Sequence, residues 1–117
     1  MIKQPLRDKI RKAAGLNFLT KAFSIADILE KNWNHQFIKY MKNRMILGFF
    51  RYGAMDKKTG LYDNIGSIEK RILKFKEDGN DEHLVDIANI CMCEFVNGVH
   101  PKKHFKSIDD GEHAKKL

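Results

Sequence analysis

The chain has 117 residues and a mass of 13.6 kDa, which is room for one domain. Hydrophobic residues make up 43% and charged residues 32%, a balance that excludes an intrinsically disordered chain and a membrane-spanning one. We therefore expect a single soluble domain over residues 1–117.

The net charge of +7 is unevenly distributed along the chain. Residues 1–58 carry a net charge of +9 and residues 59–117 a net charge of −2. A basic half suits a polyanionic partner such as a nucleotide, a nucleic acid or an acidic protein. The alternative is a solvated lysine-rich surface that has no such partner.

The two cysteines and the segment from Met1 to Lys12 indicate the cellular compartment of the protein. Cys91 and Cys93 lie two apart in a predicted helix, so they point in different directions and cannot bridge each other. The segment from Met1 to Lys12 is charged throughout and shows no signal-peptide core. Both features predict a cytoplasmic protein without a membrane segment.

The periodicity of apolar residues predicts an all-α fold. Residues 5–14 and 16–31 predict two helices that form a basic helical hairpin over residues 1–31. Residues 33–52 predict a long helix ending at Gly53, and its aromatic residues Phe37, Phe49 and Phe50 are expected in the core. Residues 54–64 lack a period and predict the main loop, with Asp63 or Asn64 capping the next helix.

Residues 65–77 and 81–97 predict an antiparallel helix pair joined by a turn at 78–80. The second of these helices is apolar on nearly every side, which places it in the middle of a bundle and favours a homodimer that covers it. The fold class is thus a helical bundle of five or six helices, with a central bundle over 33–97. Residues 98–117 predict a polar tail with a short helix anchored by Phe105 and Ile108.

A row of polar residues interrupts the apolar helix 81–97. Glu82, Asp86, Asn89 and Cys93 follow one another at steps of four, three and four residues, so they share one face of the helix. A carboxylate or amide among apolar residues needs a partner. One interpretation is an Mg²⁺ site in which Glu69, from the preceding helix, joins Glu82 and Asp86.

The other interpretation of this row is structural. Asp86 would then form a buried ion pair with Arg71, Lys70 or Arg44, and Asn89 would bond to the carbonyl group of a neighbouring helix.

The same region carries a family resemblance. The Arg-Tyr-Gly sequence at 51–53, the helix with Glu69 and Arg71, and the sequence GNDEHLVDIAN at 79–89 resemble the second half of the all-α nucleoside triphosphate pyrophosphohydrolases, the MazG-like family. Members of that family hold Mg²⁺ through Glu-x-x-Glu and Glu-Glu-x-x-Asp motifs. The resemblance places Glu82 and Asp86 in the second motif, whereas His83 replaces its second Glu.

The first motif is reduced to Glu69 alone, so the chain resembles the family with a depleted set of carboxylates. The region 37–107 also resembles small proteins of phages and mobile elements. They share its Arg-Tyr-Gly motif, its Gly-Asn-x-Glu-x-Leu-Val-Asp-x-Ala-Asn motif and its His-Pro-x-x-His-Phe motif.

Two further groups of residues are candidates for ligand binding. His100 and His104 lie four residues apart in the tail, where they could touch a bound phosphate or hold a metal, or simply accompany a helix start at Pro101. The helix 33–52 combines basic and aromatic residues, and Arg51 and Tyr52 stand at its end beside the loop.

The leading hypothesis is a nucleotide-handling protein of phage type. In its active form, Glu69, Glu82 and Asp86 hold Mg²⁺ and a metal-activated water attacks the α–β phosphate linkage of a nucleoside triphosphate. The residues expected to contact phosphate or ligand are Arg44, Arg51, Tyr52, Lys70, Arg71, Asn89, His100 and His104.

The alternative hypothesis is a non-catalytic binder. It would act as an anti-defence inhibitor that uses the positively charged N-terminal half to grip a nucleotide, a nucleic acid or a host or defence-complex protein.

Overall fold

The computed structural model describes residues 23–117, in which it contains four α-helices, one short 3₁₀ helix and no strand. This confirms the all-α class. The predicted helix at 5–14, and with it the total of five or six helices, lies outside the described residues. None of the described helices is both long and apolar enough to cross a membrane.

The chain forms two compact units, Met1–Lys39 and Tyr40–Leu117. In the first unit, helix α2 spans Ile25–Asn32 and begins at Ser24. The Ser24 hydroxyl accepts a hydrogen bond from the Asp27 backbone N–H (3.0 Å), and the Asp27 carboxylate accepts one from the Ser24 N–H (3.2 Å). This reciprocal cap fixes the start of the helix, so the prediction of helix at positions 23 and 24 was wrong.

Helix α3 spans His35–Tyr52, close to the predicted range 33–52. Its first turn is capped by Asn34, whose Oδ1 accepts a hydrogen bond from the Phe37 N–H (2.8 Å). It ends at Gly53, whose φ of +81° takes the chain out of the helix. The following loop contains the 3₁₀ helix η1 at Met55–Lys57.

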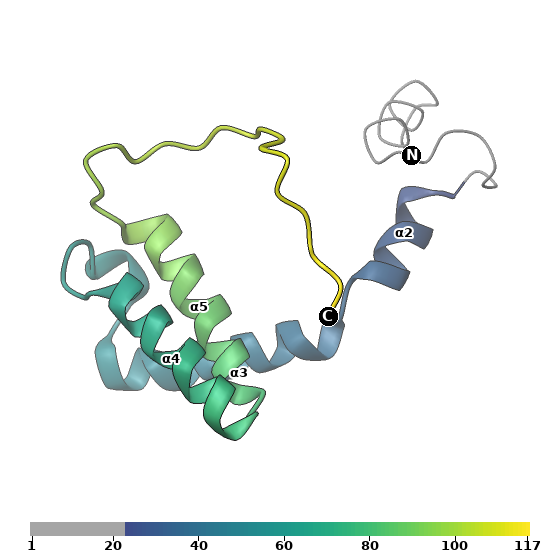
Figure 1. The fold of residues 1–117 in the computed structure, drawn as a ribbon. Coiled ribbons are helices and arrows are strands. Elements are labelled where there is room, and N and C mark those ends of the chain that lie inside the picture. Colours follow the sequence, from purple (N-terminus) through teal and green to yellow (C-terminus); the bar gives the residue numbers. More distant parts are fainter. Residues whose placement is uncertain (1–22) are drawn as a thin grey trace. The chain divides into compact units, whose positions relative to one another are not determined.

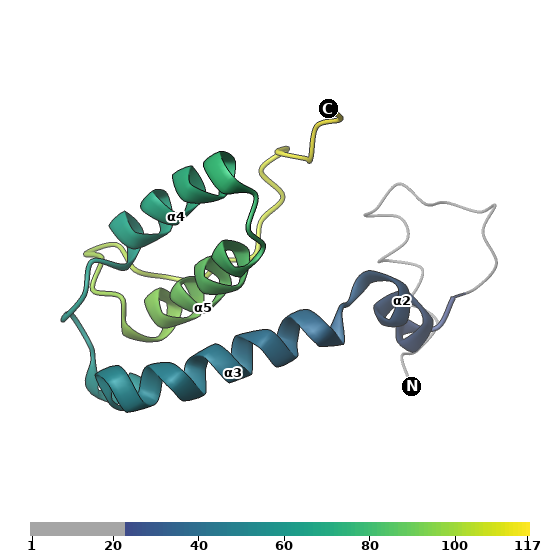
Figure 2. The same ribbon diagram turned by 90° about the horizontal axis from the view of Figure 1, so that it is seen from below.

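Helices α4 (Asn64–Asp78) and α5 (Glu82–Asn97) form the predicted antiparallel pair (Figure 1 and Figure 2). Asp63 caps α4 by accepting a hydrogen bond from the Gly66 N–H (3.0 Å). Gly79 ends α4 in the left-handed conformation, with a φ of +67°. The short connection reverses the chain and places α5 beside α4.

Few apolar side chains of the described residues are buried. Val85 on α5, 4% exposed, is the sole buried hydrophobic residue among them. Phe49 and Phe50 are exposed, the latter to 78%, so their predicted place in the core was wrong, and Phe37 is half-buried. Helix α5 is not fully covered within the chain, since Phe95 and Val96 on it are exposed.

The tail after α5 contains no helix, so the predicted short helix was wrong. Its intended anchors Phe105 and Ile108 are exposed and supply no apolar face for a helix to bury. The segment is tied back by Lys103, whose Nζ donates a hydrogen bond to the carbonyl oxygen of Phe95 (2.8 Å) at the end of α5.

Candidate functional site

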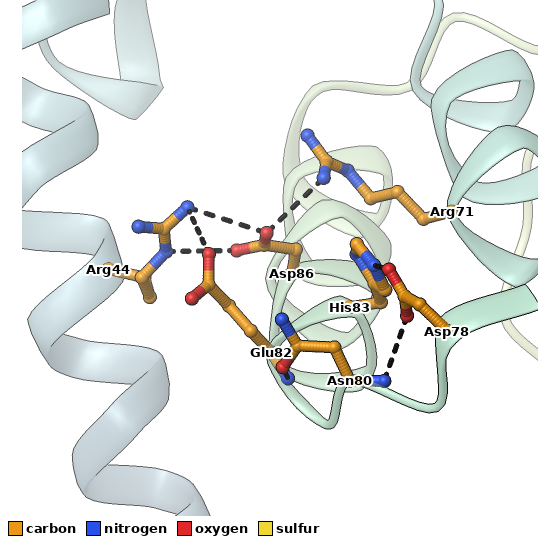
Figure 3. A network of polar contacts seen from close by, with 7 residues as sticks. All are labelled: Arg44, Arg71, Asp78, Asn80, Glu82, His83 and Asp86. Atoms are coloured by element: carbon orange, nitrogen blue, oxygen red, sulfur yellow. Dashed lines mark hydrogen bonds and ion pairs between the residues drawn. The ribbon is translucent and has the colours of Figure 1, made fainter. Parts of the chain in front are cut away.

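Asp86 on α5 lies between two arginine side chains from the two neighbouring helices (Figure 3). Arg44 of α3 donates from Nε to Oδ1 (3.1 Å) and from Nη2 to Oδ2 (3.4 Å). Arg71 of α4 donates from Nη1 to Oδ2 (3.2 Å). The Asp86 side chain is 12% exposed, and its hydrogen bond raises the pKa of Arg44. Asp86 thus forms the ion pairs with Arg44 and Arg71 that the structural interpretation expects.

The other carboxylates of the predicted Mg²⁺ site are arranged differently. Glu82 is exposed and lies 3.3 Å from Nη2 of Arg44, and Glu69 is exposed on α4. Among residues 23–117, no three His, Cys, Asp or Glu side chains gather as a metal site requires. A metal here would therefore compete with guanidinium groups for both oxygens of Asp86.

A cavity of about 400 Å³ adjoins this cluster in the unit formed by residues 40–117. Its charged lining consists of four cations and one carboxylate: Arg44, Arg51, Lys58, Arg71 and Asp86. Phe49 and Tyr52 add aromatic surface, and Asn89 adds an amide. Burial raises the pKa of the Cys93 thiol, which also lines the cavity, and this keeps it protonated. The balance of charge favours an anionic ligand.

Asn89 is 5% exposed, and its two amide atoms differ in their surroundings. Nδ2 donates a hydrogen bond to the carbonyl oxygen of Met41 on α3 (3.0 Å), which confirms the predicted bond to a neighbouring helix. Oδ1 is buried and has no hydrogen-bond partner. Arg71 also lines the cavity, and its Nε is likewise buried without a hydrogen-bond partner.

One wall of the cavity comes from the loop between α3 and α4. Asn97, at the end of α5, is 5% exposed, donates to the carbonyl oxygen of Met55 (2.9 Å) and accepts from the Thr59 hydroxyl (3.4 Å). The Lys58 ammonium lies 5.5 Å from the centre of the Tyr52 ring. The sequence analysis identified neither Lys58 as a cavity residue nor Asn97 as a support of the loop. The one sequence signal for Asn97 is an amide at the end of an apolar helix.

The tail histidines lie outside the cavity lining. His100 Nδ1 accepts from the Lys102 N–H (3.0 Å), and His104 Nδ1 lies 2.8 Å from the Lys102 carbonyl oxygen. Both histidines thus make contacts within the tail segment itself. Lys70, a further predicted phosphate ligand, is exposed on α4 and does not line the cavity either.

Comparison of the chain with protein-family models, with curated proteins and with solved structures finds no match.

Proposed function

We propose that this protein binds a nucleotide, or a similar small phosphorylated molecule, in the cavity beside Asp86, and that it does so without hydrolysing it. The observation that carries this proposal is the cavity lining, in which four cations stand against one carboxylate. Phosphate groups are the ligands that guanidinium and ammonium groups recognise most strongly.

Asp86 has a positioning role in this proposal. By accepting hydrogen bonds from Arg44 and Arg71, it holds two guanidinium groups at fixed places in the wall. Each arginine keeps N–H groups that the carboxylate does not use, and these can bind phosphate oxygens. Arg51 and Lys58 add charge, and Tyr52 offers a ring against which a base can stack.

Such a protein would be a degenerate relative of the MazG-like pyrophosphohydrolases, with an arginine pair where that family uses magnesium. Hydrolysis by an Mg²⁺ ion on Glu69, Glu82 and Asp86 is the competing version of the same idea. It requires both oxygens of Asp86 to leave their arginine partners, at a cost that metal binding must offset.

Isothermal titration calorimetry with ATP, dATP and tripolyphosphate, in EDTA and in Mg²⁺, tests the proposal. We expect binding in EDTA, and about tenfold weaker binding for Arg51→Ala, because one charge-assisted contact is lost. Lys74→Ala on α4 is the control, since Lys74 is exposed and not part of the cavity lining. Absence of binding contradicts the proposal, and Mg²⁺-dependent release of pyrophosphate favours the hydrolase.

A second candidate function rests on α3 itself. The helix has no acidic residue, and Lys42, Phe50 and Arg51 are exposed on it. Alternating basic and aromatic groups suit single-stranded nucleic acid. Binding of an oligonucleotide that weakens steeply with salt and survives Arg71→Ala would favour this function over the cavity.

We also propose that the protein works as a homodimer, because the single buried apolar side chain, Val85, gives the described residues little core of their own.

A further inference from the structure

We propose that the cavity recognises a hydroxyl group of its phosphorylated ligand, through Oδ1 of Asn89 and Nε of Arg71. The ligand would then be a sugar phosphate such as a ribonucleotide, rather than a bare polyphosphate. This inference rests on the proposed function and names the chemical class of its ligand.

The two unsatisfied atoms have opposite hydrogen-bonding character. Arg71 Nε–H can only donate, and Asn89 Oδ1 can only accept. Both residues line the same cavity, one from α4 and the other from α5. Buried polar atoms without partners are rare and costly in folded proteins, so two of them on residues that line one cavity point to a ligand group that pairs with them.

The amide of Asn89 cannot turn over to give Oδ1 a partner. Its Nδ2 faces the carbonyl oxygen of Met41, which is itself an acceptor. Turning the amide would place two oxygens against each other, so Oδ1 stays on the side where no donor is present.

A hydroxyl group fits this pair of atoms better than the alternatives do. A hydroxyl group can both accept, as Arg71 Nε–H requires, and donate, as Asn89 Oδ1 requires, whereas a phosphate oxygen satisfies only the arginine and an ammonium group only the asparagine. The Arg71 side chain has room to move and let a ligand hydroxyl approach, because it is 34% exposed. A single hydrogen bond joins it to Asp86, whereas two join Arg44 to Asp86.

The test compares ATP with 2′,3′-dideoxy-ATP and with tripolyphosphate, by calorimetry on the full-length protein. We expect wild type to bind ATP at least about fivefold more tightly than the dideoxy compound, as one hydrogen bond to a buried partner predicts. In Asn89→Ala we expect this ratio to fall to about one, while affinity for tripolyphosphate changes less than affinity for ATP.

Asn32→Ala is the control, because Asn32 is an asparagine whose Nδ2 also donates to a backbone carbonyl oxygen but which does not line the cavity. It is expected to keep the discrimination between ATP and the dideoxy compound. A ribose 5-phosphate titration shows whether the sugar phosphate alone suffices.

Equal affinity of wild type for ATP and its dideoxy analogue overturns this inference, and so does a ratio that survives Asn89→Ala. If tripolyphosphate and ATP both bind, but ATP binds no more tightly than its dideoxy analogue, the proposed function stands and the hydroxyl contact is refuted. If neither binds, the proposed function is refuted as well.

Discussion

Asp86 is a carboxylate whose neighbours decide its role. In the sequence it stands in a motif that resembles a magnesium-binding one, with Glu82 four residues before it. In the structure its oxygens face two guanidinium groups, from α3 and from α4. Those partners are 42 and 15 residues away along the chain, so the spacing within α5 could not identify them.

We predict that Asp86→Ala lowers the free energy of unfolding by about 2 kcal/mol. Removal of the carboxylate takes away the ion pair of Arg71 with Asp86 and leaves Arg44 paired only with the exposed Glu82. The partial exposure of both arginines keeps the loss below that of a fully buried pair. Urea denaturation followed by circular dichroism measures it. Glu69→Ala is the matched control, expected within about 0.5 kcal/mol of wild type because Glu69 is an exposed surface residue.

Asp78 supplies a pH-dependent contribution to stability. Its contacts with His83 (2.9 Å) and with the Asn80 N–H (2.9 Å) lower the pKa of its carboxyl below 3.8. A carboxylate with a lowered pKa stabilises the fold above the ordinary pKa of 3.8, and the contribution is lost as the pH falls through the lowered value.

We therefore predict that an NMR titration finds the Asp78 midpoint below 3.8, and that His83→Ala moves it back upward. Lys70→Ala is the control and should leave the Asp78 midpoint unchanged, because Lys70 is exposed and is not among the groups that lower the pKa of Asp78. An Asp78 midpoint unchanged by His83→Ala would show that the imidazole contact does not stabilise the carboxylate.

At the scale of the elements, the sequence predicts helix ends well where a local cap determines them. Asp63, Gly79 and Gly98 stop or start helices within one or two residues of their predicted places. The Asp63 cap and the left-handed Gly79 are set by local contacts and backbone geometry and need no knowledge of the rest of the fold. Ser24 is the exception, because the apolar periodicity of 16–31 continues through its capping box.

The two glycines at positions 79 and 48 predict opposite effects for the same substitution. Gly79→Ala should destabilise the protein by about 1 kcal/mol, because φ is +67° there. Gly48→Ala should be neutral or stabilising by up to about 1 kcal/mol, since it lies inside α3 and an added Cβ meets nothing within 4 Å. Thermal denaturation of the two variants side by side checks both signs, and equal shifts of their melting temperatures would contradict the predicted difference between them.

At the scale of the whole molecule, burial is the hardest property to predict. Apolar periodicity shows which helix face could be covered, and it predicts a core position for Phe49 and Phe50. Whether a face is covered depends on how many helices surround it, which periodicity does not encode. For the same reason the cavity, which is lined from α3, the loop, α4 and α5, can be predicted only in part. The lining residues that the sequence identifies are Arg44, Arg51, Tyr52, Arg71, Asp86 and Asn89.

The proposed homodimer predicts that stability depends on protein concentration. If a second copy covers apolar surface, the urea midpoint should rise over a hundredfold increase in protein concentration, by mass action. Sedimentation velocity over the same range should show the mass changing from 13.6 kDa toward twice that value. A midpoint and a mass that stay constant at the monomer value would refute the dimer.

The two hydrogen bonds of Asn97 have a consequence for how far the chain can be shortened. They join the last turn of α5 to the connection that follows α3, so the segment carrying Lys58 is supported by a residue almost forty positions later. Truncation before Asn97 would remove that support and release the segment, even though every residue of the cavity lining would remain. Truncation after Gly98 would leave it in place, which sets the C-terminal limit of any fragment meant to retain the cavity.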